Sequence, residues 1–225
     1  MQYLLMWLEG PFQSWGDSSK YGPRDTLPFP TKSGIYGMIL AAMGAKGTQE
    51  NLLEKLAVCS QSIIAFSKTS ILRDFHMVGS GYDDQDGWQR LSIPKKQDGS
   101  AAVGGGSKMT YRYYLQEAKF GVIQALHAEL VDQIVQALQF PVYSPCLGRK
   151  SCVPSEYVYQ GIFKSEKEAI ITAQTLGTQK GLKQLLMVSE NQIVDGDPQI
   201  IADVPVRFGS QKEYRERTVY VTNYE

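Results

Sequence analysis

Apolar residues run without interruption through residues 3–8, Tyr-Leu-Leu-Met-Trp-Leu. Such a run is typical of a strand that is buried on both faces. After Thr31, a residue type that often caps helices, apolar residues recur three and four positions apart. This spacing predicts an amphipathic helix that ends near Gly44. Its apolar face would consist of Ile35, Met38, Ile39, Ala42 and Met43.

The same patterns predict further elements along the chain. They indicate helices at 51–58, 127–138 and 166–176, and strands at 63–72, 111–115, 120–126 and 218–221. The order strand, helix, strand, strand, helix fits an α+β protein with a ferredoxin-like, or RRM-like, βαββαβ body. RNA-recognition modules share that fold with many unrelated proteins, so it does not establish a function.

Residues 74–110 lack hydrophobic periodicity and are rich in glycine, with a run at Gly104-Gly105-Gly106. Compact domains rarely carry loops longer than about 15 residues without a purpose. We therefore expect a hairpin arm, or thumb, that projects from a body formed by residues 1–73 and 111–161. Residues 162–225 give weak signals and are expected to form a small C-terminal region.

Charge and cysteine content narrow the functional classes. Lys and Arg together number 23, as do Asp and Glu, so the formal net charge is zero. Proteins that bind nucleic acid alone and strongly are usually basic, so any such binding here needs a local basic site or an assembly. Three scattered cysteines and two distant histidines suit a reducing compartment and predict neither a metal site nor a cofactor.

The start of the chain does not look like a targeting signal. The apolar run at 3–8 lacks a basic leader and a small-residue cleavage site, and is far shorter than the roughly 20 residues that span a bilayer. We therefore expect a cytoplasmic protein that has no contact with membranes.

Two short motifs are candidates for binding anions. Pro30-Thr31-Lys32-Ser33-Gly34 combines hydroxyls and a cation with the free amides of a helix start, where the helix dipole favours a phosphate. Gly148-Arg149-Lys150-Ser151 combines a glycine, two adjacent cations and a serine in a turn-rich segment, which is typical of a compact phosphate-binding loop. Taken singly, the first is also consistent with an ordinary capped helix, and the second with a basic surface turn.

Together with other segments, these motifs resemble the CasD family of subunits from the Cascade complex of type I-E CRISPR systems, within the repeat-associated RNA-binding superfamily. The similarity extends over residues 1 to about 161 and follows the family order. The matching segments are Gly10-Pro11, Gln13, Trp15-Gly16, Pro30–Gly34, Leu72–His76, Tyr111–Leu115 and Gly148–Cys152.

The resemblance implies a subunit that works in antiviral defense within a ribonucleoprotein. Such subunits hold the 5′ handle of the CRISPR RNA (crRNA) and cap the filament of backbone subunits, with the large subunit as another neighbour and target DNA as an indirect partner. The candidate RNA-binding residues are Gln13, Trp15, Arg24, Thr31, Lys32, Ser33, Gly34, Lys108, Arg112, Gly148, Arg149, Lys150 and Ser151.

Catalysis is the main alternative. Cleavage of precursor crRNA through the 2′-hydroxyl needs a general base and a cation, roles that His76 with Tyr82 or Lys108 could fill without metal. Because the resemblance implies a separate processing nuclease, we expect no catalytic residue in this chain. A protein-interaction module that binds no RNA would explain the neutral charge but would leave both anion motifs unused.

Overall fold

The computed structural model describes residues 1–16, 22–78, 83, 85–93, 95–96, 98–100, 108–192 and 195–224, without the side chains of residues 78, 92 and 108. Within them, a seven-stranded sheet has the order β10-β11-β9-β4-β7-β1-β8, and all its neighbouring strands are antiparallel. Its strands are β1 (Gln2–Glu9), β4 (Gln61–Ala65), β7 (Lys119–Leu126), β8 (Tyr159–Phe163), β9 (Leu186–Ser189), β10 (Asp197–Arg207) and β11 (Glu213–Asn223).

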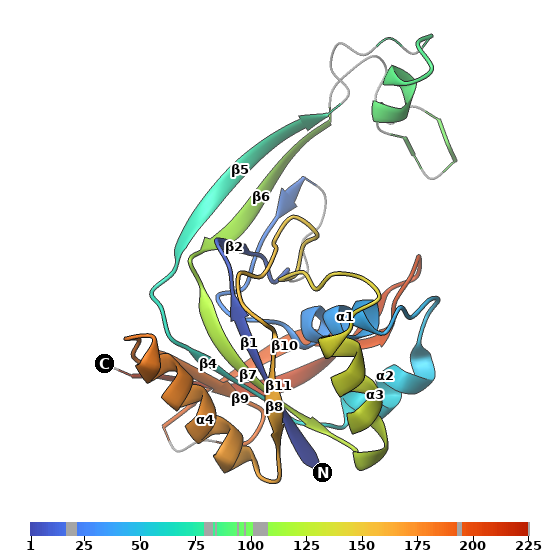
Figure 1. Ribbon diagram of the computed structural model, residues 1–225. Helices are drawn as coiled ribbons and strands as arrows, with labels where there is room; N and C mark the ends of the chain where they lie inside the picture. The colour runs from blue at the N-terminus through green and yellow to red at the C-terminus, as the bar shows by residue number, and fades with distance from the viewer. Residues whose placement is uncertain are drawn as a thin grey trace.

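Helices cover both faces of this sheet (Figure 1). On one face lie α1 (Lys32–Ala42), α2 (Glu50–Ala57) and α3 (Ala128–Gln139), and on the other lies α4 (Glu166–Gln179). Strand β1 shows why both faces are covered, because its side chains alternate between two cores. Leu4, Met6 and Leu8 pack in the core that includes α1 and α3, whereas Leu5 and Trp7 pack with α4. The predicted strand with two buried faces is therefore confirmed.

A two-stranded ribbon rises away from the body (Figure 1). It consists of β5 (Ser70–Val78) and β6 (Lys108–Gln116), which pair from Ser70↔Gln116 to Val78↔Lys108. Two short strands, β2 (Phe12–Gln13) and β3 (Pro23–Arg24), flank the lower part of β6. Between the two long strands, the structure describes a short 3-10 helix, η1 (Gln89–Ser92). The glycine run at 104–106 lies outside the described residues.

The structure confirms the α+β class. Elements β1, α1, β4, β7, α3 and β8 follow one another in the expected order, with α2 and the ribbon inserted between them. Where a single strand was expected at 63–72, β4 ends at Ala65 and β5 starts at Ser70. The ribbon strands also extend beyond the expected limits of 74 and 110. Within the described residues, no helix is both long and apolar enough to cross a membrane.

The C-terminal residues, expected to form a small region of their own, extend the main sheet. Strand β9 pairs with β4, and β11 pairs with β9 on one side and β10 on the other. Strand β10 was not predicted from the sequence because it contains Pro198 and Pro205, and proline is unfavourable in most strands. Proline is tolerated here because β10 is an edge strand of the sheet. The hairpin formed by β10 and β11, here called the C-terminal hairpin, thereby lies next to the start of α1 (Figure 1).

Candidate nucleic-acid interface

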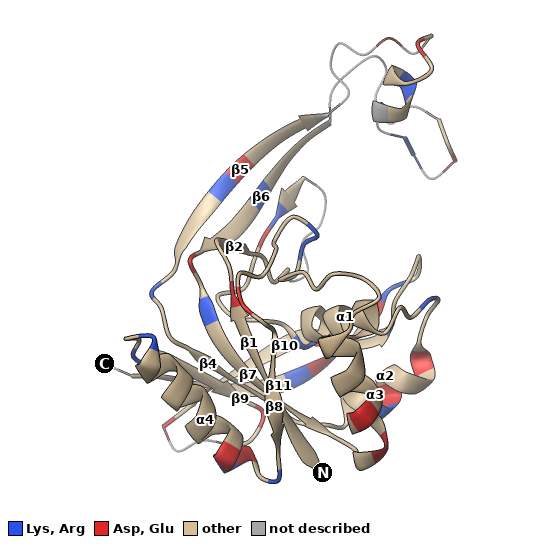
Figure 2. Ribbon diagram, in the orientation of Figure 1, with Lys and Arg blue, Asp and Glu red and all other residues tan. Residues whose placement is uncertain are grey.

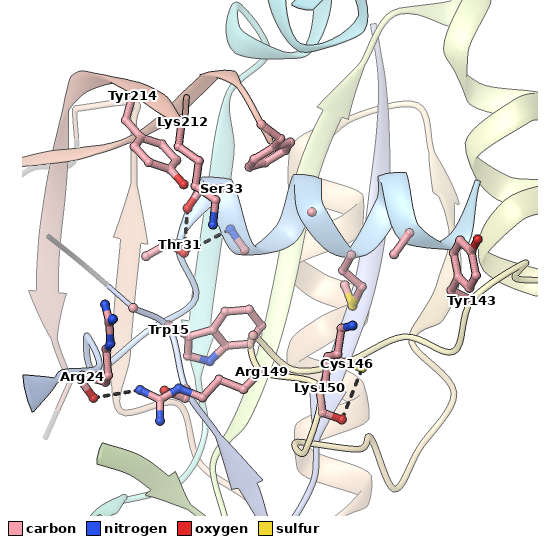
Figure 3. A pocket seen from close by; sticks show the side chains of 18 of the residues that line it. Trp15, Arg24, Thr31, Ser33, Tyr143, Cys146, Arg149, Lys150, Lys212 and Tyr214 are labelled. Atoms are coloured by element: carbon pink, nitrogen blue, oxygen red, sulfur yellow. Dashed lines mark hydrogen bonds between the residues drawn. The ribbon is translucent and has the colours of Figure 1, made fainter. Parts of the chain in front are cut away.

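A pocket of about 820 Å³ brings together segments that are far apart in the sequence (Figure 3). They include the first turns of α1, the loop before β8 and the C-terminal hairpin. Both predicted anion motifs contribute to it, together with Arg24 from β3. Its lining includes Trp15, Arg24, Thr31, Ser33, Gly34, Tyr143, Gly148, Arg149, Lys150, Phe208, Lys212 and Tyr214.

The pocket is basic although the protein as a whole is neutral. Arg24, Arg149, Lys150 and Lys212 line it, and Asp25 is the one acidic residue among its described lining residues. Figure 2 shows basic segments in the loop above α1, whereas acidic segments gather on α2 and α3. The separation of charge provides the local basic site that a neutral chain would need to bind an anion.

Arg149 has the most defined geometry among these cations. Its Nη2 donates a 2.8 Å hydrogen bond to the Arg24 carbonyl oxygen, and its guanidinium carbon lies 4.9 Å from the centre of the Tyr114 ring. Its Nη1 is buried and has no hydrogen-bond partner in the described part of the chain. An unsatisfied buried donor costs about 1–3 kcal/mol.

Close contact with Ser14 fixes the loop that carries Arg149. Gly148 has a φ of +88°, and a Cβ added to it would lie 1.8 Å from the Ser14 carbonyl oxygen. The backbone nitrogen of Ser14 also donates to the carbonyl oxygen of Leu147 at 3.1 Å. Glycine is therefore needed here both for the backbone conformation and for the space.

The start of α1 differs from the expected anion site. Thr31 is the N-cap, as predicted, and its hydroxyl accepts a hydrogen bond from the Gly34 amide at 3.1 Å. The Lys32 amide donates to Oδ2 of Asp203 at 2.6 Å. The helix start therefore does bind an anion, but the anion is a carboxylate of the same chain. Ser33 remains at the pocket surface, where its hydroxyl donates to Thr31 Oγ1 at 3.3 Å.

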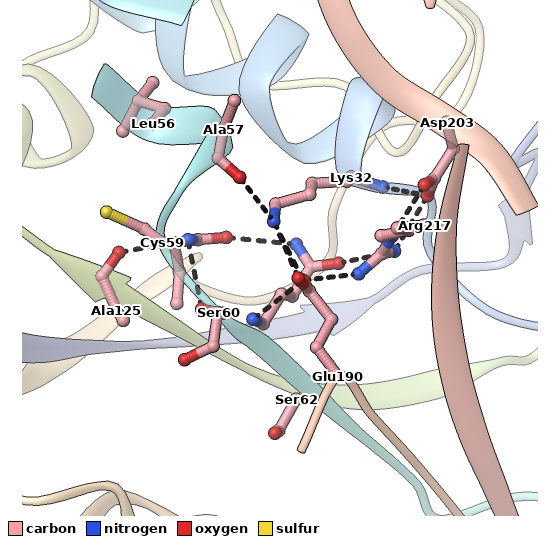
Figure 4. Close-up of polar contacts among 12 residues, drawn as sticks. Lys32, Leu56, Ala57, Cys59, Ser60, Ser62, Ala125, Glu190, Asp203 and Arg217 are labelled. Carbon is pink, nitrogen blue, oxygen red and sulfur yellow. Dashed lines mark hydrogen bonds and ion pairs between the residues drawn. The ribbon is translucent and has the colours of Figure 1, made fainter. Parts of the chain in front are cut away.

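The expected phosphate contact by Lys32 is wrong. The Lys32 side chain has 0% exposure, and its Nζ lies 2.8 Å from Oε1 of Glu190. The same oxygen accepts from Arg217, which also forms two hydrogen bonds with Asp203 (Figure 4). Burial lowers the pKa of Lys32, and the neighbouring Glu190 carboxylate opposes that shift. Lys32, Glu190, Arg217 and Asp203 form what we call the buried ionic cluster.

Gln13, Trp15 and Gly34 belong to the framework beneath the pocket. Gln13 has no exposed surface; its amide donates to the carbonyl oxygens of Leu8 and Ala118 and accepts from Trp15 Nε1. A Cβ added to Gly34 would lie 2.8 Å from the Trp15 ring, so this glycine makes room for tryptophan rather than for a ligand backbone. The expected direct RNA contact by Gln13 is therefore corrected to a structural role.

The remaining predicted residues lie around the pocket. Arg112 pairs in register with Arg24 on the neighbouring strand, so the two side chains emerge on the same face. This extends the basic surface from the pocket onto the ribbon. Ser151 is exposed but does not line the pocket. Lys108 belongs to β6, and its side chain lies outside the described residues.

His76 lies on the ribbon and does not line the pocket. Its Nε2 is 2.5 Å from Oδ2 of Asp74, two residues earlier on the same strand. Of the groups considered as its catalytic partners, Tyr82 and the side chain of Lys108 lie outside the described residues.

Sequence reasoning missed the contribution of the C-terminal hairpin. Phe208, Lys212 and Tyr214 line the pocket, although they follow the two predicted motifs by many residues and belong to no recognised pattern. The only local signal is Gly209-Ser210, which is typical of a turn between two strands.

Comparison with known proteins assigns the chain to a family. The profile of the CRISPR-associated protein family Cas_Cas5 matches residues 3–220. The chain belongs to the Cas5 family. This Cas5 chain is 29% identical over 189 residues to the "CRISPR system Cascade subunit CasD" of Escherichia coli (strain K12), covering 78% of each protein. The resemblance found in the sequence is thus confirmed.

Two solved structures share the fold of this Cas5 chain. A chain of a "CRISPR RNA-guided surveillance complex" matches with a TM-score of 0.74 and 24% identity, covering 99% of this chain and 90% of the other. A "Crystal structure of Cas protein" matches with a TM-score of 0.67 and 24% identity, covering 98% and 94%.

Proposed function

We propose that this Cas5 chain is an RNA-binding subunit of a Cascade-type CRISPR surveillance complex and that its pocket holds the 5′ handle of the crRNA. The observation that carries the proposal is the pocket itself, in which the Gly148–Ser151 loop and Arg24 gather cations from distant parts of a neutral chain. Family membership and the similarity to the Cascade subunit support the same assignment.

The chemistry of the pocket suits a phosphodiester backbone. A guanidinium presents a planar fork that matches phosphate geometry, and Arg149 lines the pocket. Lys150 adds a point charge and Arg24 adds a second guanidinium to the same pocket. With zero net charge, the chain gains little from long-range attraction to RNA. The rest of the affinity would come from partner subunits that hold the same RNA.

The ribbon supports a role in assembly at the end of the backbone filament. Directly paired residues lie on one face, so Phe75↔Tyr111 and Met77↔Met109 form an apolar stripe, and Ile71 lies on the same face beyond Arg73. These five side chains are between 40% and 62% exposed. Exposed apolar stripes of this kind mark interaction surfaces. We assign this stripe to contact with the neighbouring backbone subunit.

We further propose that the chain does not cleave RNA. His76 lies on the ribbon rather than among the residues of the basic pocket. One observation favours the alternative, an endoribonuclease that processes precursor crRNA: the Asp74 carboxylate contacts the His76 ring and could orient it as a general base.

Nuclease protection of the guide RNA tests the proposal. The chain is produced with its neighbouring subunits, and the crRNA in the purified complex is probed with a nuclease that cuts single strands. We expect the 5′ handle to be protected in the wild-type complex and cleaved when Arg149 and Lys150 are both replaced by alanine. A handle that remains equally protected in a complex without this chain would contradict the proposal.

A further inference from the structure

We propose that the C-terminal hairpin forms a second wall of the RNA site, with Lys212 binding a phosphate that is different from the one bound by Arg149. The inference rests on the proposed function and deepens it. It assigns to the C-terminal third of the chain a direct part in binding the guide RNA.

Cations line the pocket from two different walls. Lys212 and Tyr214 line the pocket from the hairpin, whereas Arg149 and Lys150 line it from the loop before β8. Figure 3 shows these two groups on opposite sides of the start of α1. Because the start of α1 lies between the two groups, a ligand that meets both must extend across the pocket. The arrangement therefore fits a chain of successive phosphates, as in a single-stranded nucleic acid.

The charge of Lys212 is not neutralised by the acidic residue beside it in the sequence. The nearest acidic neighbour of Lys212 in the sequence, Glu213, is occupied by Arg207, whose Nη2 lies 2.9 Å from its Oε2. Arg207 also donates to the Gln211 carbonyl oxygen, which ties the turn together. In the described part of the chain, Lys212 forms no ion pair and is exposed. Its ammonium group is therefore available to an external anion.

The hairpin also presents an aromatic surface to the pocket. Phe208 and Tyr214 both line it, and Tyr214 is 40% exposed. Aromatic rings beside a cationic groove are the usual means by which proteins hold single-stranded nucleic acid, because each base has a flat face that can stack.

The buried ionic cluster holds this wall in place. Asp203 lies on β10 and Arg217 on β11, and they are joined by hydrogen bonds of 2.6 Å and 2.8 Å across the hairpin. Asp203 also accepts the Lys32 amide at the start of α1. The hairpin is therefore fixed to the helix whose first turn borders the pocket. Asp203 and Arg217 thus act as positioning residues for Lys212.

The contact is tested by measuring affinity for guide RNA in the assembled complex across salt concentrations. Lys212→Ala is compared with Arg149→Ala and with Lys167→Ala, a control at an exposed lysine of α4 on the other face of the sheet. We expect Lys212→Ala to weaken binding roughly tenfold, as for loss of a charge-assisted contact. It should also reduce the slope of log K against log salt by about 1. Lys212→Arg should retain most of the affinity.

Comparing Lys212→Ala, Arg149→Ala and Lys167→Ala distinguishes failure of the Lys212 contact from failure of the proposed function. If Arg149→Ala weakens binding but Lys212→Ala behaves like Lys167→Ala, this inference is overturned and the proposed function stands. If neither Arg149→Ala nor Lys212→Ala differs from Lys167→Ala, the proposed function fails, and this inference fails with it.

A double-variant cycle tests positioning. Arg217→Lys keeps the charge but loses the planar fork that holds Asp203. We expect Lys212→Ala to cost less affinity in the Arg217→Lys background than in wild type, because Lys212 is no longer held at the pocket. Fully additive effects would mean that Arg217 supports only the fold, and would overturn the positioning role. Since Lys212 is exposed, Lys212→Ala tests the contact independently of this cycle.

Discussion

Nζ of Lys32 lies 2.8 Å from Oε1 of Glu190, and the lysine side chain is fully shielded from solvent. Removing one partner of a buried ion pair leaves the remaining charges poorly compensated and typically costs about 3 kcal/mol or more. We therefore predict that Lys32→Ala lowers the free energy of unfolding by about 3 kcal/mol, measured by denaturant titration.

Lys55 provides a matched control for this prediction. It forms an ion pair with Glu129 over the same 2.8 Å, but both side chains are more than half exposed. Exposed pairs of this kind contribute about 0–1 kcal/mol, so Lys55→Ala should leave stability nearly unchanged. Equal effects of the two substitutions would show that Lys32 is solvent-accessible, contrary to the structure.

The loop before β8 depends on Gly148. An added Cβ would lie 1.8 Å from the Ser14 carbonyl oxygen, so Gly148→Ala should displace the loop and with it Arg149. We predict a loss of stability and a weaker affinity of the assembled complex for guide RNA, measured by chemical denaturation and filter binding.

Gly47→Ala is a control that shows how much of the effect of Gly148→Ala comes from backbone strain alone, without a steric clash. Gly47 has a φ of +82°, close to the +88° of Gly148, but an added Cβ would meet no atom within 4 Å. We expect Gly47→Ala to lower the free energy of unfolding by only about 1–2 kcal/mol, the cost typical of a non-glycine residue in the left-handed conformation. The variant should bind RNA as wild type does. If Gly148→Ala binds RNA as well as Gly47→Ala does, the shape of the loop is not important for the site.

Replacing two glycines of α1 by alanine should change the stability of the protein in opposite directions. A Cβ at Gly34 would lie 2.8 Å from the Trp15 ring, so Gly34→Ala should destabilise the protein. At Gly37 the space is open, and replacing a glycine inside a helix by alanine typically gains about 0.5–1 kcal/mol. Thermal unfolding should therefore show a lower Tm for Gly34→Ala and a higher one for Gly37→Ala. The same sign for both would contradict the packing of Gly34 on Trp15.

The spacing of apolar residues and the capping residues predicted the helices and strands whose formation depends on neighbouring residues in the sequence. The helix after Thr31 and the buried strand at 3–8 follow from apolar spacing and from a capping residue. The same reasoning failed for Lys32, because its environment is set by Glu190, Asp203 and Arg217, which lie far away in the sequence. A helix start predicts an anion but cannot tell whether that anion is a ligand or a carboxylate of the same chain.

The candidate site was predicted in part for the same reason. The Gly148–Ser151 loop carries its cations in one short segment, and most of it lies at the pocket. Lys212 and Tyr214 reach the pocket because β11 pairs with β9 and β9 with β4, a strand order that no local pattern specifies. The two prolines in β10 further weaken the strand signal of that hairpin.

Catalysis is tested with the purified chain alone and a labelled repeat RNA, with and without magnesium. We predict that the RNA stays intact in both conditions and that His76→Ala changes nothing. Cleavage at one site that disappears in His76→Ala, but persists in Lys167→Ala, would favour the endoribonuclease alternative.

The central claim is that the basic pocket holds the 5′ handle, and its most direct test is the affinity of the assembled complex for full-length and handle-truncated guide RNA. We predict that Arg149→Ala weakens binding of full-length RNA by about 1–3 kcal/mol, less at high salt, and that Lys167→Ala has no effect. Truncating the handle should abolish the difference between Arg149→Ala and wild type. If Arg149→Ala binds full-length RNA as wild type does at every salt concentration, the pocket does not bind the handle.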